Sequence, residues 1–191
     1  MMTAARLWYT TPPTEYMSGL PIGTGRLAAM VMGTPETERV ALNHEWLWRG
    51  ITRNRDTETR SHLLLEVREL LLAGKYDEGT RRANEAFGGP GGTSKTPCRV
   101  DPYQPAGDLH FSLQHGAVSN YRRELDLKQG LVTVTYEADG VRYRRDYLAH
   151  LKHDLLLVRI TASRAFTGTF WLSRITDSAC FLRNETSVDS L

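Results

Sequence analysis

The sequence predicts a mostly β chain, an antiparallel β-sandwich with an inserted helical hairpin near residues 61–87. Two observations lead to this prediction. Apolar and polar residues alternate through short segments separated by turn residues, a pattern typical of sandwich strands. Between residues 61 and 87 the apolar period changes to that of a helix. With 191 residues, of which 40% are hydrophobic, we expect one domain with a buried core.

Three strands are expected before residue 50. A short one covers Leu7–Tyr9, and a hairpin joins Arg26–Met32 to Glu38–Leu42 through Gly33-Thr34-Pro35. The preceding Gly23-Thr24-Gly25 could open a dinucleotide-binding loop. Position 28 is Ala instead of the required glycine, and a strand-like run follows where a helix would be needed. We therefore interpret these glycines as a tight turn.

The inserted segment is predicted to hold two helices. Leu64, Val67 and Leu71 form an apolar stripe within Ser61–Leu72, and Gly74 stands where a helix would end. Tyr76–Phe87 is a second, more highly charged helical stretch. The glycine-rich segment from Gly88 to Pro97 follows, and we expect it to be the most mobile internal part of the chain.

The remaining residues are predicted to be strands. Asp139-Gly140 is a favoured hairpin turn, and the nearly continuous apolar run Leu155–Ala162 is typical of a central strand. The last strand starts near Phe166 with little sequence after it, so we expect the domain to be truncated at its C-terminal end. The expected strands are Asp108–Leu113, Tyr121–Leu127, Gly130–Ala138, Val141–Ala149, Leu155–Ala162 and Phe166–Ile175.

Charge and cysteine usage exclude several classes of function. The net charge of +2 comes from 24 basic and 22 acidic residues, which indicates neither nucleic acid nor a membrane as partner. The densest basic cluster, Arg142, Arg144 and Arg145, is interpreted as a solvated strand face. The two cysteines are expected to be free thiols. We see no signal peptide and expect a cytoplasmic protein without cofactor or metal.

The pair His150 and His153 has a spacing that could bind a metal only on a helix, and we interpret it as an exposed turn. Asp108 opens a strand and is interpreted as a turn or capping carboxylate. No Ser, Cys or His in the sequence forms a recognisable catalytic triad.

The end of the first hairpin is the strongest candidate for a binding site. It concentrates indole surface, an amide, an imidazole and charged groups, a mixture that suits a sugar with a C–H face and hydroxyl groups. Two alternatives stay open: the tryptophans could belong to the core, and Glu45 could be an ion-pair partner of Arg49. The candidate cleft residues are Asn43, His44, Glu45, Trp46, Trp48 and Arg49.

Six short blocks in order resemble the N-terminal domain of glycoside hydrolase family 95. The resemblance extends from about Leu7 to about Phe170. One difference lies at the hairpin end, where family members commonly have Leu-Asn-Glu-Asp-Thr-Leu-Trp and this chain has Leu-Asn-His-Glu-Trp-Leu-Trp. The blocks are Leu7–Tyr9, Leu20–Leu27, Leu42–Trp48, Gly74–Tyr76, Tyr103–Leu109 and Tyr121–Leu127.

This resemblance implies a β-sandwich attached to an α-L-fucosidase, or in some members an α-galactosidase. It also implies that the catalytic acid and base lie in a downstream (α/α)6 barrel, which these 191 residues do not contain. We therefore expect no catalytic residue here and a structural, cleft-lining role, with the barrel and a carbohydrate substrate as partners. The alternative is a stand-alone carbohydrate-binding or interaction module.

Overall fold

The computed structural model describes residues 5–48, 50, 59–87, 103–177 and 180–183. The chain forms two compact units, one made of residues 1–47 together with 104–191 and one made of residues 48–103. Each unit is described by itself below. The segment Gly88 to Pro97, expected to be the most mobile, lies outside the described residues.

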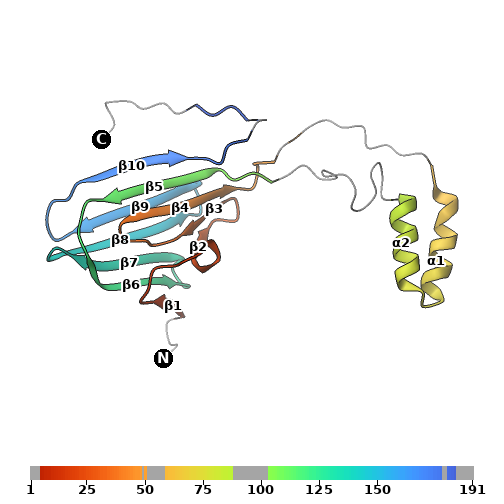
Figure 1. Cartoon of the computed structure of the whole chain (residues 1–191), viewed down its shortest axis with the longest axis horizontal. Coiled ribbons are helices and arrows are strands. Elements are labelled where there is room, and N and C mark those ends of the chain that lie inside the picture. The colour runs from red at the N-terminus through yellow and green to blue at the C-terminus, as the bar shows by residue number, and fades with distance from the viewer. Residues whose placement is uncertain (1–4, 49, 51–58, 88–102, 178–179, 184–191) are drawn as a thin grey trace. The chain divides into compact units, whose positions relative to one another are not determined.

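The first unit consists of two five-stranded antiparallel sheets, which confirms the predicted β-sandwich (Figure 1). Sheet 1 has the strand order β1-β6-β7-β8-β9 and sheet 2 the order β10-β5-β4-β3-β2. In sheet 1 the strands are β1 (Arg6–Tyr9), β6 (Val118–Asp126), β7 (Leu131–Ala138), β8 (Val141–His150) and β9 (Leu155–Ala162). In sheet 2 they are β10 (Gly168–Ser173), β5 (Gly107–Leu113), β4 (Thr37–His44), β3 (Leu27–Val31) and β2 (Leu20–Gly23).

Strand β2 is absent from the sequence-based prediction. It has four residues, one of them Pro21, and such a short strand with a proline gives little periodic signal. Leu20 pairs with Val31 and Gly23 with Ala28, so the glycines at positions 23–25 belong to the turn of a β2–β3 hairpin. Gly25 has φ +94°, which confirms that this turn needs glycine.

The prediction that Leu155–Ala162 is a central strand is wrong. Strand β9 lies at the edge of sheet 1 and pairs with β8 alone. Leu156, Val158 and Ile160 pack on the core, whereas the side chains of Leu155 and Leu157 are 51% and 46% exposed. The continuous apolar run of β9 therefore consists of two rows of aliphatic side chains, one that faces the core and one that is exposed.

The core lies between the two sheets and is built from the alternating inward positions predicted for the central strands. Fully buried side chains include Val31 and Val40 from sheet 2, and Val132 and Val134 from β7. Burying each such side chain contributes about 1.5–3 kcal/mol, so the facing rows hold the two sheets together.

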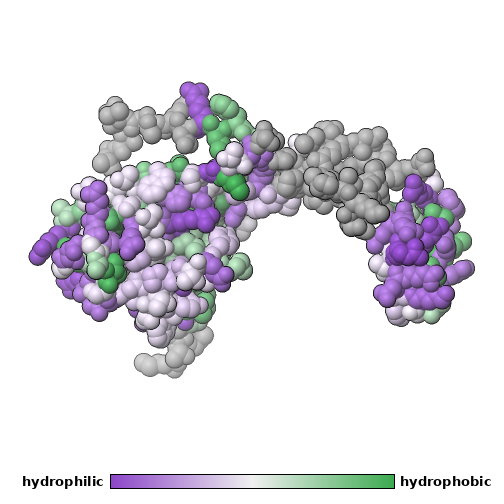
Figure 2. Space-filling model, in the orientation of Figure 1, coloured by the Kyte–Doolittle hydropathy of each residue, from purple (hydrophilic) through white to green (hydrophobic). Residues whose placement is uncertain are grey.

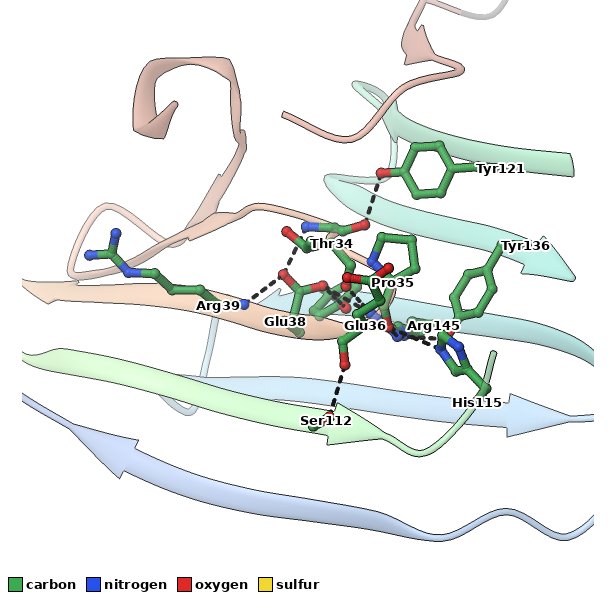
Figure 3. Close-up of polar contacts among 12 residues, drawn as sticks. Thr34, Pro35, Glu36, Glu38, Arg39, Ser112, His115, Tyr121, Tyr136 and Arg145 are labelled. Atoms are coloured by element: carbon green, nitrogen blue, oxygen red, sulfur yellow. Dashed lines mark hydrogen bonds and ion pairs between the residues drawn. The ribbon is translucent and has the colours of Figure 1, made fainter. Parts of the chain in front are cut away.

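An ion pair between Glu38 and Arg145 crosses this core, and both side chains are fully buried (Figure 3). The Arg145 Nη1 atom lies 3.4 Å from Glu38 Oε2, and the Tyr147 hydroxyl donates to the same oxygen at 2.6 Å. Glu38 Oε1 accepts hydrogen bonds from the backbone N–H groups of Gly33 and Arg39 at 2.8 and 3.0 Å. The carboxylate is thus surrounded by donors.

The sequence-based interpretation of the basic cluster is therefore wrong for one of its members. Arg142 and Arg144 are exposed, but Arg145 points inward because strand residues alternate between faces. Its guanidinium donates to the carbonyl oxygen of Thr34 at 2.7 Å, to that of Pro35 and to the hydroxyl oxygen of Tyr136 at 2.5 Å. These bonds fix the Gly33–Glu36 loop of sheet 2 against β8 of sheet 1.

Burial raises the pKa of Glu38, while the Tyr147 hydroxyl, the Arg145 charge and the two backbone donors act in the opposite direction. For Arg145, burial acts to lower the pKa, but Tyr147, Tyr136 and Glu38 outweigh it and the pKa is raised. Removing two charges from water costs free energy. The fold tolerates this pair because nearly every polar atom of the two side chains has a hydrogen-bond partner. The exception within the described part of the chain is Arg145 Nε.

The second unit contains the predicted helical hairpin. A 3-10 turn, η2 (Ser61–Leu63), precedes α1 (Leu64–Leu72), and α2 covers Tyr76–Phe87 as predicted. Gly74 has φ +75° and ends the first helix, which confirms its role. Figure 2 shows that the visible face of this unit is mostly hydrophilic. Arg82 and Glu66 join the two helices at 2.8 Å.

None of the helices in the described ranges is long and apolar enough to cross a membrane.

We predict that breaking the buried pair strongly destabilises the sandwich. Glu38→Gln and Arg145→Met should each lower the free energy of unfolding by about 3–5 kcal/mol, because each leaves a buried charge without its partner. The double variant should be less destabilised than the sum of the two, which urea denaturation would measure. As a matched control, Arg142→Met on the exposed face of β8 should change stability by about 0.5 kcal/mol or less. Equal, small effects in all three single variants would contradict this role.

Candidate functional site

The candidate site lies where the chain leaves sheet 2 at the end of β4 and returns before β5. Backbone hydrogen bonds hold the two passages together, from Gln104 N to Leu47 O at 2.7 Å and from Ala106 N to Leu42 O at 3.0 Å. Glu45 N donates to Arg26 O at 2.9 Å, which attaches the same segment to the β2–β3 turn. The side chains that follow β4 are therefore presented on a fixed backbone.

Arg26 is the centre of the site. Its Nε atom lies 3.2 Å from Glu45 Oε1 and 3.4 Å from Asp154 Oδ2, and its guanidinium carbon lies 4.3 Å from the centre of the Trp46 ring. One guanidinium thus joins two carboxylates and an indole that come from two other chain segments. We call Arg26, His44, Glu45, Trp46 and Asp154 the Arg26 cluster.

His44 connects the end of β4 to this cluster. Its Nδ1 atom accepts a hydrogen bond from the Trp46 backbone N–H at 3.3 Å, which places the proton of the neutral ring on Nε2. The imidazole meets the Trp46 ring edge to face, with 5.2 Å between ring centres. His44 Nε2 lies 3.9 Å from Asp154 Oδ2, which is beyond hydrogen-bond length. The hydrogen bond to the Trp46 backbone and the contact between the two rings orient Trp46.

Trp46 is 69% exposed, so the interpretation that both tryptophans belong to the core is wrong for this residue. Arg26 covers one face of the indole, and cation–π contact of this kind contributes about 0.5–1 kcal/mol at an exposed site. An exposed, oriented indole beside hydrogen-bonding groups can receive the C–H face of a sugar ring. Trp48 is also exposed and belongs to the second unit, where it contacts Tyr103 edge to face at 5.1 Å.

Not all the predicted site residues converge. Asn43 alternates with His44 along β4 and shares a face with Ala41, so it points to the opposite side of sheet 2. Arg49 lies outside the described residues, and the ion pair expected between it and Glu45 lies outside them too. Within the described residues, Glu45 pairs with Arg26.

Sequence reasoning did not identify Arg26 or Asp154 as site residues. Arg26 follows the Gly23-Thr24-Gly25 turn, and Asp154 follows His153 of the histidine pair. The two residues are 128 positions apart in the sequence. Asp154 adopts φ +47°, a left-handed conformation that Asp tolerates, in the turn between β8 and β9. The alternating pattern could predict both turns, but only the packing of the two sheets brings them together.

The prediction that the histidine pair is an exposed turn is confirmed for His153 alone, because His150 is the half-buried last residue of β8. The His150 and His153 rings are 4.8 Å apart, and His150 Nδ1 accepts from Lys152 N at 3.3 Å. Within the described part of the chain, no group of three or more His, Cys, Asp or Glu side chains could hold a metal ion. Asp108 is not the predicted turn cap, because its Oδ2 accepts from Arg39 Nε at 2.9 Å across β5 and β4.

The Arg26 cluster places guanidinium, carboxylate and imidazole groups beside an exposed indole. A glycosidase acid must deliver a proton to the leaving oxygen, with a second carboxyl group about 5–10 Å away acting as base or nucleophile. Glu45 and Asp154 share one arginine as ion-pair partner, at 3.2 and 3.4 Å. These groups can hydrogen-bond hydroxyl groups beside the exposed indole.

Comparison with known proteins agrees with this geometry. Residues 7–189 match the model of the family described as glycosyl hydrolase family 65, N-terminal domain. The chain is 29% identical to alpha-L-fucosidase 2 of Arabidopsis thaliana over 172 residues, which cover 88% of this chain and 19% of that protein. It is 26% identical to a probable alpha-fucosidase A of Aspergillus oryzae over 133 residues, covering 65% of this chain and 17% of that protein.

The chain thus spans about a fifth of the length of these two relatives. The family match extends over nearly all residues of the sandwich and of the inserted helical unit. This match over more than half of the chain shows the family, and the β-sandwich agrees with it. The chain belongs to the family of N-terminal domains of glycosyl hydrolase family 65.

Proposed function

We propose that this chain is the N-terminal domain of an α-L-fucosidase-like glycoside hydrolase of family 95, or of a related α-galactosidase. In this proposal the domain itself is non-catalytic. It supports a separate (α/α)6 catalytic barrel and lines one side of the substrate cleft. The observation that carries the proposal is the match of 88% of the chain to a relative named as an α-L-fucosidase.

The Arg26 cluster is the part of the domain that would face the cleft. It stands at the end of β4, where the chain leaves sheet 2, and its indole is exposed and held by Arg26 and His44. Exposed aromatic surface beside polar groups is typical of ligand sites and interfaces. Trp46 would supply apolar surface to the sugar, and Glu45 and Asp154 would orient Arg26.

We predict that the purified chain hydrolyses neither aryl α-L-fucosides nor aryl α-galactosides above background, because the proposal places the catalytic acid and base in the separate barrel. A chromogenic assay over prolonged incubation would measure this. Turnover that survives purification and disappears in Glu45→Gln or Asp154→Asn would overturn the non-catalytic role.

We also predict that Trp46→Ala lowers the stability of the chain by about 1 kcal/mol or less, because the indole is mostly exposed and loses mainly its contact with Arg26. Phe111→Ala, which removes a fully buried ring, should cost about 3–5 kcal/mol and serves as the contrast. Thermal or urea unfolding of both variants measures the difference.

In the full-length gene product that contains this domain, Trp46→Ala should raise the KM or lower the kcat for the glycoside substrate. Unchanged kinetics would remove Trp46 from the proposed cleft. The sequence encoded downstream of the domain gives a second check, since a gene product without a helical barrel would favour the stand-alone carbohydrate-binding module.

A further inference from the structure

The outer face of sheet 1 contains a polar groove that the proposed function does not use. Residues on β7 that alternate with the buried Val132 and Val134 point away from the core, as do their partners on β6 and β8. They surround a cavity of about 360 Å³, at the small end of the ~300–1,000 Å³ typical of ligand sites. The lining residues are Arg6, Arg122, Glu124, Asp126, Gln129, Leu131, Thr133, Thr135 and Arg144.

A second hollow continues this groove toward the edge of the sheet. It has a volume of about 400 Å³ and shares Thr135 and Arg144 with the first. It extends over Glu137 and Arg142 to Thr161 on β9. The groove therefore crosses β6, β7, β8 and β9, which gives room for more than one unit of a chain-like ligand.

The charges of the groove are paired and fixed. Glu124 is bound by Arg6 at 2.9 Å and by Arg122 at 2.6 Å. Arg144 pairs with Asp146 at 2.8 Å, and Thr133 donates to the same carboxylate at 2.8 Å. These two carboxylates are largely buried beneath arginines that remain about half exposed.

This pairing argues against an ionic ligand. The arginines Arg6, Arg122 and Arg144 are matched by Glu124, Asp126 and Asp146, so the groove has no excess of either sign. Each guanidinium has five N–H donors and each carboxylate has several lone pairs, more than the ion pairs consume. A preorganised, charge-balanced array of donors and acceptors matches an uncharged ligand with many hydroxyl groups.

Trp8 adds the apolar element. It lies directly opposite Glu124 in the β1–β6 pair, on the same outer face, and is 54% exposed. The Arg122 guanidinium carbon lies 4.6 Å from the centre of the Trp8 ring and holds the indole beside the groove. An aromatic side chain fixed next to hydrogen-bonding groups can receive the C–H face of a pyranose ring.

We infer that the outer face of sheet 1 is a second carbohydrate-binding site, for a neutral glycan chain, separate from the Arg26 cluster. Trp8 is its stacking platform, and the Arg122–Glu124 and Arg144–Asp146 pairs hydrogen-bond the sugar hydroxyls. This inference goes beyond the proposed function, because it needs neither catalysis nor a catalytic barrel.

The test is titration calorimetry of the chain with fucosyl-lactose, lactose and cellotetraose as neutral probes and a heparin tetrasaccharide as an anionic one. At least one neutral probe should bind, with an affinity that hardly changes between low and high salt. Trp8→Ala should weaken that binding about tenfold, the loss of one good aromatic contact. Trp171→Ala, which removes an exposed indole from β10 of the other sheet, is the matched control and should bind as the wild type does.

Thr133→Val keeps the shape of a groove residue and removes the hydroxyl that bonds Asp146, so it tests the groove independently of Trp8. It should also weaken binding while the thermal melt stays close to that of the wild type. Trp46→Ala separates this site from the cleft proposal: binding that is lost in Trp8→Ala belongs to the groove, and any binding that is lost in Trp46→Ala belongs to the Arg26 cluster.

Three results would overturn the inference. The first is that no neutral probe binds. The second is that binding is lost in Trp46→Ala and kept in Trp8→Ala, which would place the ligand at the Arg26 cluster. The third is that only the heparin fragment binds, in a salt-sensitive manner, which would make the groove an anion site. None of these results bears on whether the domain belongs to a fucosidase.

Discussion

The rest of the sandwich depends on the ion pair between Glu38 and Arg145. The same Arg145 side chain, on β8 of sheet 1, also donates hydrogen bonds to the carbonyl groups of Thr34 and Pro35 in a loop of sheet 2. These bonds fix the loop against the strand. Tyr121 adds a hydrogen bond from its hydroxyl to Gly33 O at 2.8 Å (Figure 3). Apolar packing supplies most of the stabilisation of the sandwich, but it is not directional. The polar network decides how the β3–β4 hairpin is set against the opposite sheet.

That setting has a consequence for the surface. Glu38 lies near the start of β4 and His44 at its end, so the strand fixed by the buried pair also presents the Arg26 cluster. Asp154 comes from the β8–β9 turn, and β8 carries Arg145. Arg26, in the turn before β3, completes the surface ion pair with Asp154.

The two outer features have different chemistry. In the Arg26 cluster one arginine contacts two carboxylates and an indole at the point where the chain leaves sheet 2. On the outer face of sheet 1, three arginines and three acids alternate over a shallow groove beside another indole. Both combine guanidinium, carboxylate and tryptophan, but the first is compact and the second is extended. A domain with both could contact a glycan at a cleft and along its chain.

The sequence by itself determined the fold class, most strands, both helices and the glycine positions of the main turns. These follow from periodicity and from turn chemistry, which are local properties: the Asp139-Gly140 turn has φ values of 52° and 72°, as such a turn requires. Its composition also made the end of β4 the candidate site, where Trp46 is exposed. The short strand β2 was missed because four residues give too little alternation to be noticed. The edge position of β9 was missed because a local pattern does not show which strands pair.

Only the tertiary structure decided which charges are buried and which residues meet. Alternation along β8 places Arg145 on the face opposite to Arg142 and Arg144, but only the opposite sheet supplies Glu38 as its partner. Arg26 and Asp154 join the site from distant turns for the same reason. The physical cause is that an ion pair forms between two segments of the chain. Its free energy depends on the distance between the two charges, and neither segment alone sets that distance.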